Sequence, residues 1–219
     1  MIAKIGNKAP NLKVSKWAQG IPTNIDKEKD NVVLVEVFQV NCPGCFLYGI
    51  PAAIEIYNKY RNDGVRVFGL ATAFEDYDKN TLKNLELLLG TGQVIGETYN
   101  ALSQYGALKD NKISYKIPFP VAMDSVKREE ENWTESRVME FIKGNFPEFG
   151  SYGDMEKANM IERVKEYLAT KEFSAETFEE YALRGTPSSI LIDKKGILRN
   201  VSFGQNGYLD TMVKELLEE

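Results

Sequence analysis

Histidine is missing from all 219 residues of this chain, and cysteine occurs only twice. Without histidine, Ser-His and Cys-His catalysis and any histidine-ligated metal are excluded. Two cysteines cannot build a disulfide framework. They stand three positions apart, at Cys42 and Cys45. In a cytosolic chain, such a close pair is expected to be redox-active or metal-binding rather than structural.

The chain also lacks an excess of positive charge and any long apolar segment. Its net charge is −5 and its pI is near 5.1, which argues against a nucleic-acid-binding protein, because phosphate binding needs a basic face. No apolar run approaches the ~20 residues that span a bilayer, and the first residues lack the apolar core of a secretory signal. We therefore expect a cytoplasmic protein that binds neither nucleic acid nor membrane.

The apolar residues, 43% of the chain, follow an alternation of strands and helices. Residues 32–40 (VVLVEVFQV) predict a buried strand, residues 43–62 a helix kinked at Pro51, and residues 65–72 a second strand. Further predicted elements are a hairpin around Trp17, helices at 82–89, 94–105 and 208–217, a strand at 117–123, and a hairpin of 188–193 with 197–203. This order predicts one α/β domain over residues 1–219, with a central mixed sheet flanked by helices.

A charged segment, residues 125–182, interrupts this order and is predicted to be a helical insertion. Its expected helices are 135–143, 155–170 and 175–183, the last with Ser174 as N-cap. The acidic run 129–131 is typical of a solvated helix face. Apolar side chains predict a small core of its own: Trp133, Met139, Phe141, Ile142, Phe146, Phe149, Met160, Ile161, Val164, Tyr167, Leu168, Phe173 and Phe178. Because the insertion ends close to Pro187 in sequence, we expect it to cap the active site.

The two cysteines belong to the sequence Cys42-Pro43-Gly44-Cys45, at the junction of the first predicted strand and helix. With Cys42 as N-cap and Pro43 as the first helical residue, the Cys42 sulfur meets unpaired N–H groups and the positive end of the helix dipole. Both favour the nucleophilic thiolate. Cys45 can then attack a mixed disulfide at Cys42, and Gly44 leaves the sulfurs open to another backbone. Half of a shared zinc site and a plain structural disulfide are the alternatives.

The stretches VLVEVFQVNCPGC and RGTPSSILIDKKGILRNVSFG, with the opening IGNKAPNLKVSKWAQG, resemble the thioredoxin superfamily, most of all its redoxin branch, which includes peroxiredoxins. The resemblance covers about residues 8–124 and 181–219. It implies a thioredoxin-like fold and an enzyme, a thiol-disulfide oxidoreductase. We expect no cofactor and no metal.

The resemblance assigns roles to four positions. Cys42 matches the attacking cysteine and Cys45 the resolving cysteine. Pro187 matches a proline that is cis in the family, an isomer that exposes the Thr186 backbone for pairing with an extended substrate. Without the resemblance, Thr186-Pro187 reads equally well as an ordinary start of a strand. Together with Pro43 and Gly44, these two residues form the expected substrate-binding set.

Glu36, the one charge in the first predicted strand, lies six residues before Cys42. That offset matches a buried carboxylate of thioredoxins, usually aspartate, and implies that Glu36 takes the proton from Cys45. An exposed or structurally paired carboxylate is the alternative. The chain departs from the family at Asn41, where thioredoxins usually carry tryptophan, and in its long insertion. Both departures leave the substrate open.

Three functions compete. The first is disulfide exchange with a protein or small-molecule partner, restored by a reducing partner. The second is a peroxiredoxin-like peroxidase with Cys42 as the peroxidatic cysteine, which wants Thr or Ser where this chain has Gln39 and an arginine such as Arg184 or Arg199. The third is a partner-binding module built on the insertion. The direction of electron flow and the oligomeric state stay open.

Overall fold

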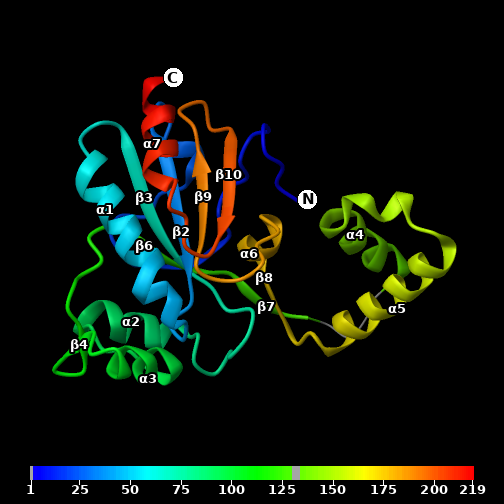
Figure 1. The fold of residues 1–219 in the computed structure, drawn as a ribbon, viewed down its shortest axis with the longest axis horizontal. Coiled ribbons are helices and arrows are strands. Elements are labelled where there is room, and N and C mark those ends of the chain that lie inside the picture. The colour runs from blue at the N-terminus through cyan, green and yellow to red at the C-terminus, as the bar shows by residue number, and fades with distance from the viewer. Residues whose placement is uncertain (1, 130–133) are drawn as a thin grey trace.

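A six-stranded mixed sheet forms the centre of the molecule in the computed structural model, which describes residues 2–129 and 134–219 (Figure 1). The strand order is β1-β6-β3-β2-β9-β10. β2, β3 and β6 run parallel, whereas β1, β9 and β10 pair antiparallel with their neighbours. The bounds are β1 Val14–Gln19, β2 Val32–Phe38, β3 Val65–Ala71, β6 Val121–Asp124, β9 Ser188–Ile192 and β10 Leu198–Phe203. The predicted α/β fold with a central mixed sheet is confirmed.

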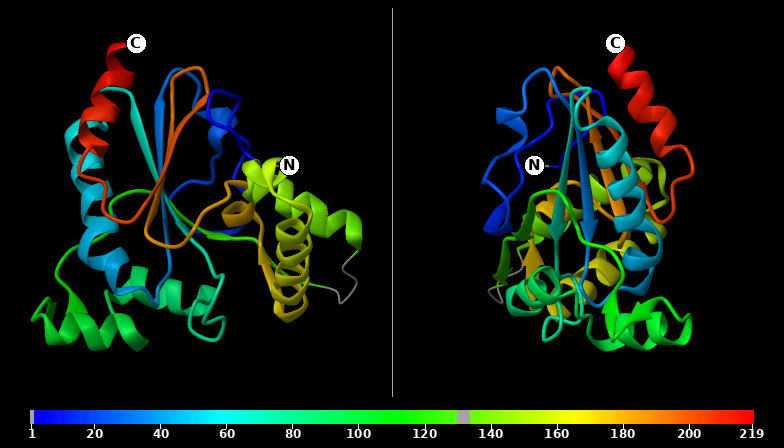
Figure 2. Two further views of the ribbon diagram at one scale, coloured as in Figure 1. Left: turned by 45° about the vertical axis from the view of Figure 1, so that its right-hand side comes forward. Right: turned by 90° about the vertical axis from the view of Figure 1, so that its left-hand side faces the viewer.

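β2 is the central strand, and all seven of its residues are buried. Because side chains alternate across a strand, Leu34 and Phe38 join the core on one face of the sheet. Val33 and Val35 join the core on the other face. Helices α1 (Ile50–Tyr60) and α7 (Leu209–Glu218) cover the first face, and the chain before β2, which includes the short 3-10 turn Ile25–Lys27, covers the second (Figure 2). The buried strand therefore needs apolar residues at nearly every position.

Helices α2 (Leu82–Thr91) and α3 (Gly96–Gln104) lie beside the start of α1, at the lower end of the sheet in Figure 1. The short strands β4 (Leu108–Lys109) and β5 (Lys112–Ile113) follow them. This end of the sheet is where β2 and β3 finish, so the loops that leave these strands meet there. Within the described residues, no helix is long and apolar enough to span a membrane.

Some sequence-based elements differ in the structure. Trp17 lies in β1, which pairs with β6 rather than forming a local hairpin. The strand predicted at 117–123 begins only at Val121, after both prolines, because proline cannot donate to the sheet ladder. The helix predicted from residue 175 shrinks to α6 (Glu176–Glu180). Ser174 is not its N-cap, because it lies in strand β8 (Phe173–Ala175), whose pairing with β7 (Val126–Arg128) overrides the local helix signal.

The insertion forms a helical arm, defined here as α4 (Glu135–Asn145), a 3-10 turn (Pro147–Ser151) and α5 (Asp154–Thr170), carried by the β7–β8 ribbon. Its core is separate from those of the sheet. Four side chains are buried in it, with six more packed against them: Val138, Ile142, Val164 and Leu168, then Met139, Phe141, Phe146, Phe149, Met160 and Ile161. Residues 130, 131 and 133 lie outside the described residues. Figures 1 and 2 place the arm beside the domain rather than over the start of α1, so the expected cap is wrong.

Candidate active site

A π-helical turn, Cys45–Gly49, precedes α1 and contains the second cysteine. Its wide hydrogen bond joins the Ile50 N–H to the Cys45 carbonyl. The cause is Pro51, which cannot donate to the carbonyl four residues earlier, so the helix widens into a π turn just before the proline. The Phe46 carbonyl in this turn accepts a hydrogen bond from the Tyr115 hydroxyl, at 2.9 Å. The turn is thus stabilised from outside the helix.

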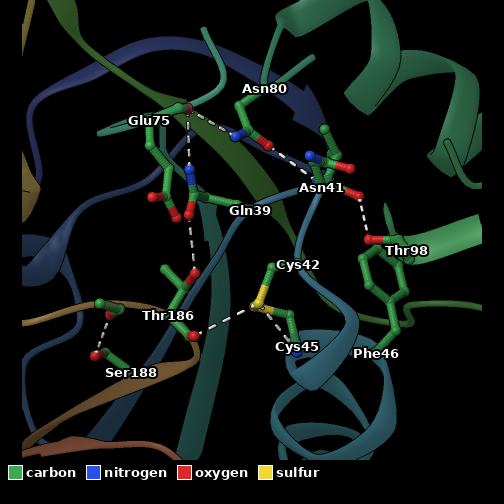
Figure 3. The surroundings of a disulfide bond; sticks show 12 residues. Gln39, Asn41, Cys42, Cys45, Phe46, Glu75, Asn80, Thr98, Thr186 and Ser188 are labelled. Atoms are coloured by element: carbon green, nitrogen blue, oxygen red, sulfur yellow. Dashed lines mark hydrogen bonds between the residues drawn. A yellow bond between two sulfur atoms is a disulfide. The ribbon is translucent and has the colours of Figure 1, made fainter. Parts of the chain in front are cut away.

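Cys42 and Cys45 form a disulfide at the start of this helix (Figure 3). The two sulfurs differ in access, because Cys42 is partly exposed whereas Cys45 is completely buried. The Cys45 N–H donates to the Cys42 Sγ at 3.3 Å, as an N-cap interaction would. A negative charge on the Cys42 sulfur would be stabilised by this contact and by the helix N-terminus.

The loop before β9 lies directly against the disulfide. The Thr186–Pro187 peptide bond is cis, and the Cys42 Sγ lies 3.5 Å from the Thr186 carbonyl oxygen. Gly44 faces the same loop, since a Cβ added there would lie 3.6 Å from Pro187 Cδ. Pro43, between Cys42 and Gly44, is partly exposed. The structure therefore brings together all the predicted substrate-binding residues around one sulfur.

Glu36 lies in the middle of β2, opposite Ser189 of β9, and only 1% of it is exposed. The Ser189 hydroxyl donates to Glu36 Oε2 at 2.7 Å, whereas Oε1 has no hydrogen-bond partner among the residues that the structure describes. Burial raises the pKa of Glu36 to about 8, although the Ser189 hydrogen bond opposes this shift. At neutral pH the carboxyl group is therefore mostly protonated.

Gly49, which the sequence analysis did not single out, fixes the position of the Glu36 carboxyl group. A Cβ added at Gly49 would overlap Glu36 Oε1 and Pro187 Cβ. The carboxyl group thus lies against the helix one turn after Cys45. Gly49 and Ser189 also line a pocket of about 470 Å³ between α1 and the segment that leads into α7. A glycine inside a helical pattern was the available signal for this close approach.

A set of buried amides holds the loops around Cys42, and sequence reasoning missed it (Figure 3). Asn41 donates through Nδ2 to Asp76 at 2.6 Å and accepts the Glu97 N–H of α3 at 2.8 Å. Its own N–H donates to Asn80 Oδ1 at 2.9 Å. Where related proteins usually carry tryptophan, this chain has an inward-pointing amide that joins three segments. Only the departure from the family pattern pointed to it.

No protein-family model matches this chain, and no curated protein matches it. Solved structures do. A thioredoxin-like superfamily protein is 26% identical, with a TM-score of 0.61 over 98% of both chains. A thiol-disulfide isomerase from Corynebacterium glutamicum is 27% identical, with a TM-score of 0.58 over 96% of this chain and 97% of its own. These alignments span nearly the full chain, so they include the helical arm. The predicted thioredoxin-like fold is confirmed.

Proposed function

We propose that this chain, a thioredoxin-like protein with a C-x-x-C disulfide, is an enzyme that exchanges its Cys42–Cys45 disulfide with the thiols or disulfides of a partner. The observation that carries the proposal is the unequal access of the two sulfurs at the start of one helix. Cys42 is reachable and acts as the attacking cysteine, and Cys45 is shielded and resolves the intermediate. The name of the isomerase with the similar structure supports the same chemistry.

The exchange begins with the reduced chain, when the Cys42 thiolate attacks one sulfur of a substrate disulfide. The substrate S–S bond breaks, one substrate sulfur leaves as a thiolate, and Cys42 is held in a mixed disulfide. The Cys45 thiolate then attacks the Cys42 Sγ and releases the second substrate thiolate. The substrate gains two electrons and two protons, and the chain keeps the Cys42–Cys45 disulfide. A dithiol partner reverses these steps on the chain and restores it.

Glu36 supplies the proton acceptor for the second step. Its carboxylate takes the proton from the Cys45 thiol, and returns it when the disulfide is reduced. The raised pKa of Glu36, about 8, supports this role, because the ionised fraction of the group is a stronger base toward the Cys45 thiol than an ordinary carboxylate. The pocket lined by Gly49 and Ser189 offers that proton a short way to water.

The substrate approaches over Pro43 and Gly44 and pairs with the backbone at Thr186, beside Pro187. The closeness of the Thr186 carbonyl to the Cys42 sulfur supports this placement. An extended segment paired here would bring its own sulfur within reach of Cys42. A protein disulfide can use this pairing, and a small disulfide reaches Cys42 without it. The cytoplasmic location and the need for a reducing partner stay predictions.

The peroxidase alternative has less support. A peroxidase would need a hydroxyl at position 39 to polarise the peroxide. This chain has Gln39 there, and its amide is already hydrogen-bonded to the Glu75 carbonyl and to the Thr186 hydroxyl. Arg199 is held by Asp193 at 3.1 Å and by Glu219, at the β9–β10 hairpin. Arg184 is exposed, and no contact of it with Cys42 is found among the described residues. A partner-binding role for the arm is compatible with disulfide exchange and does not replace it.

Insulin reduction by dithiothreitol tests the proposal. The reduced chain, freed of dithiothreitol, is mixed with 5,5′-dithiobis(2-nitrobenzoate) (DTNB) to test a small disulfide. We expect the wild-type chain to accelerate insulin reduction and Cys42→Ser to abolish the acceleration. With dithiothreitol removed, reduced Cys45→Ser mixed with insulin should accumulate a mixed disulfide between Cys42 and an insulin chain, visible by mass spectrometry, because the resolving thiol is missing. A wild-type chain that accelerates neither reaction, or a Cys42→Ser variant that keeps the full rate, would overturn the proposal.

A further inference from the structure

Gln39 lies between the end of β2 and Cys42, and its side chain is almost fully buried, with 1% of the residue exposed. It carries no charge and cannot titrate, so it has no part in the proton steps. Its amide nevertheless reaches both loops that flank the disulfide (Figure 3). The Thr186 hydroxyl donates to Gln39 Oε1 at 3.1 Å, and Gln39 Nε2 donates to the Glu75 carbonyl at 3.3 Å. One side chain thus ties the Thr186–Pro187 loop to the loop after β3.

The Glu75 end of this link is itself held. The Glu75 carbonyl also accepts a hydrogen bond from Asn80 Nδ2 at 2.9 Å. Asn80 Oδ1 in turn accepts the N–H of Asn41, two residues after Gln39, at 2.9 Å. The backbone from Gln39 to Asn41 closes the ring. Since the ring includes the residue before Cys42, the anchor point of Gln39 cannot shift without moving the sulfur as well.

The Thr186 end of the link faces the reacting atom. Thr186 is only partly buried, and its carbonyl oxygen lies 3.5 Å from the Cys42 Sγ. Its hydroxyl bond to Gln39 therefore fixes the backbone that lies over the sulfur. Without that bond, a buried amide would lose its partner and the loop would lose its side-chain tether. Backbone pairing with an extended substrate needs this loop in one conformation.

We propose that Gln39 is a positioning residue that holds the Thr186–Pro187 loop in the conformation that pairs with a polypeptide substrate, through its hydrogen bond with the Thr186 hydroxyl. This inference rests on the proposed function and deepens it. Only an amide serves at position 39, because the site requires an acceptor toward Thr186 and a donor toward Glu75. Glutamate keeps the acceptor and loses the donor. Leucine keeps the approximate size and loses both.

Steady-state kinetics with two disulfides of different size separate a positioning role from a general structural one. Insulin needs backbone pairing, whereas DTNB is too small to use it. We expect Gln39→Leu and Thr186→Val to raise the KM for insulin about 5- to 20-fold, a range typical of losing one buried hydrogen bond. For Gln39→Leu, which does not contact the substrate, the kinetics with DTNB should change less than twofold. Thr186→Ser, which keeps the hydroxyl, should behave like the wild type.

The double variant Gln39→Leu/Thr186→Val supplies the second readout. If the two residues act through one hydrogen bond, the double variant is no worse than either single variant. Equal losses toward insulin and DTNB, or losses that multiply in the double variant, would overturn the inference and leave the proposed function standing. A wild-type chain that reduces neither disulfide overturns both. Thr186→Val changes a partly exposed side chain without changing its size, so it keeps the test decisive if Gln39→Leu fails to fold.

Discussion

The surroundings of the disulfide and the helical arm are held in different ways. Around Cys42, segments far apart in sequence are joined by partly buried hydrogen bonds, such as those of Gln39 with Thr186 and of Asn41 with Glu97. The arm instead has its own small core and is joined to the domain by the β7–β8 ribbon. We therefore expect single substitutions around Cys42 to disturb several segments at once. The arm, with its separate core, can be removed as a unit.

Two aromatic contacts link the regions at the base of the arm. Phe178 of α6 stacks on Phe74 with ring centroids 4.5 Å apart, and Phe173 lies 4.6 Å from Tyr77. Phe74 and Tyr77 belong to the loop whose Glu75 carbonyl accepts the Gln39 amide. Beyond this contact, a groove of about 1020 Å³ lies between the domain and the arm. The ribbon and α6 therefore belong to the domain, whereas α4 and α5 are attached to it.

The largest expected effect concerns Glu36 and pH. A carboxyl group whose pKa rises from 4.5 to about 8 on folding stabilises the fold below pH 4.5, and this contribution is lost as the pH rises to 8. The loss is about 5 kcal/mol. Glu36→Gln should therefore be several kcal/mol more stable than the wild type at pH 8.5 and similar to it at pH 5, measured by urea unfolding of the disulfide forms.

This measurement is unusually clean, because the chain has no histidine to titrate between those pH values. Asp124, whose pKa burial also raises, is present in both proteins and cancels in the comparison. The same variant should slow disulfide exchange, because an amide cannot accept the Cys45 proton. If the free energy of unfolding of the two proteins differs by the same amount at pH 5 and pH 8.5, the pKa of Glu36 is not raised in the folded chain.

Gly49→Ala comes next in size. The new methyl group would overlap the Glu36 carboxyl group and Pro187, so we expect a loss of about 1–3 kcal/mol in the free energy of unfolding and slower disulfide exchange. Gly90→Ala in α2 is the matched control, because a Cβ there meets nothing within 4 Å. Alanine is the better helix former, so the control should be neutral or slightly stabilising. Equal effects of the two substitutions would contradict the close packing at Gly49.

Replacing the arm should have the smallest effect. Arg128 pairs with Phe173 at the end of the β7–β8 ribbon, so an Asn-Gly turn in place of residues 129–172 would close the ribbon as a hairpin. We expect this variant to fold and to reduce insulin within twofold of the wild-type rate, since the arm lies beside the domain. Circular dichroism and the insulin assay check this. A large gain in rate would show that the arm restricts access to Cys42 in solution.

A deeper deletion, residues 126–178, is the control for that experiment. It also removes Thr177 and Phe178, whose backbone N–H groups both bind the buried Asp124 carboxylate at 3.0 and 3.2 Å. The buried Asp124 carboxylate would then keep the hydrogen bond from the Thr72 hydroxyl, at 2.9 Å, but lose both backbone donors. This loss, together with the lost aromatic contact, should destabilise the domain. If the two deletion variants have the same free energy of unfolding, the β7–β8 ribbon and α6 do not belong to the domain.

The sequence was most informative where a short run of residues determines its local structure. The apolar run 32–38 could only be a buried strand, and the C-x-x-C motif placed the disulfide at the helix start. Long-range polar contacts could not be predicted, because nothing local indicates that Asn41 meets α3 or that Gln39 meets Thr186. Ser174 was misread for a related reason, since the pairing of β8 with β7 is decided by tertiary contacts.

The placement of the insertion was also beyond the sequence. Its apolar residues predicted a core correctly for Ile142 and Val164, but a helical pattern does not say which surface a helix pair will face. Phe173 and Phe178, predicted as part of that core, contact the domain instead. Gly49 and Ser189, which hold Glu36, carried no signal beyond a glycine within a helical pattern.

A single-turnover reaction tests the central claim most directly. The chain is fully reduced, freed of reductant and mixed with excess insulin, and its cysteines are then alkylated and mapped by mass spectrometry. We predict that one insulin disulfide is lost for each chain and that Cys42 and Cys45 become linked to each other. Insulin that stays oxidised while both cysteines remain free thiols would contradict the proposal that this disulfide is exchanged with a partner.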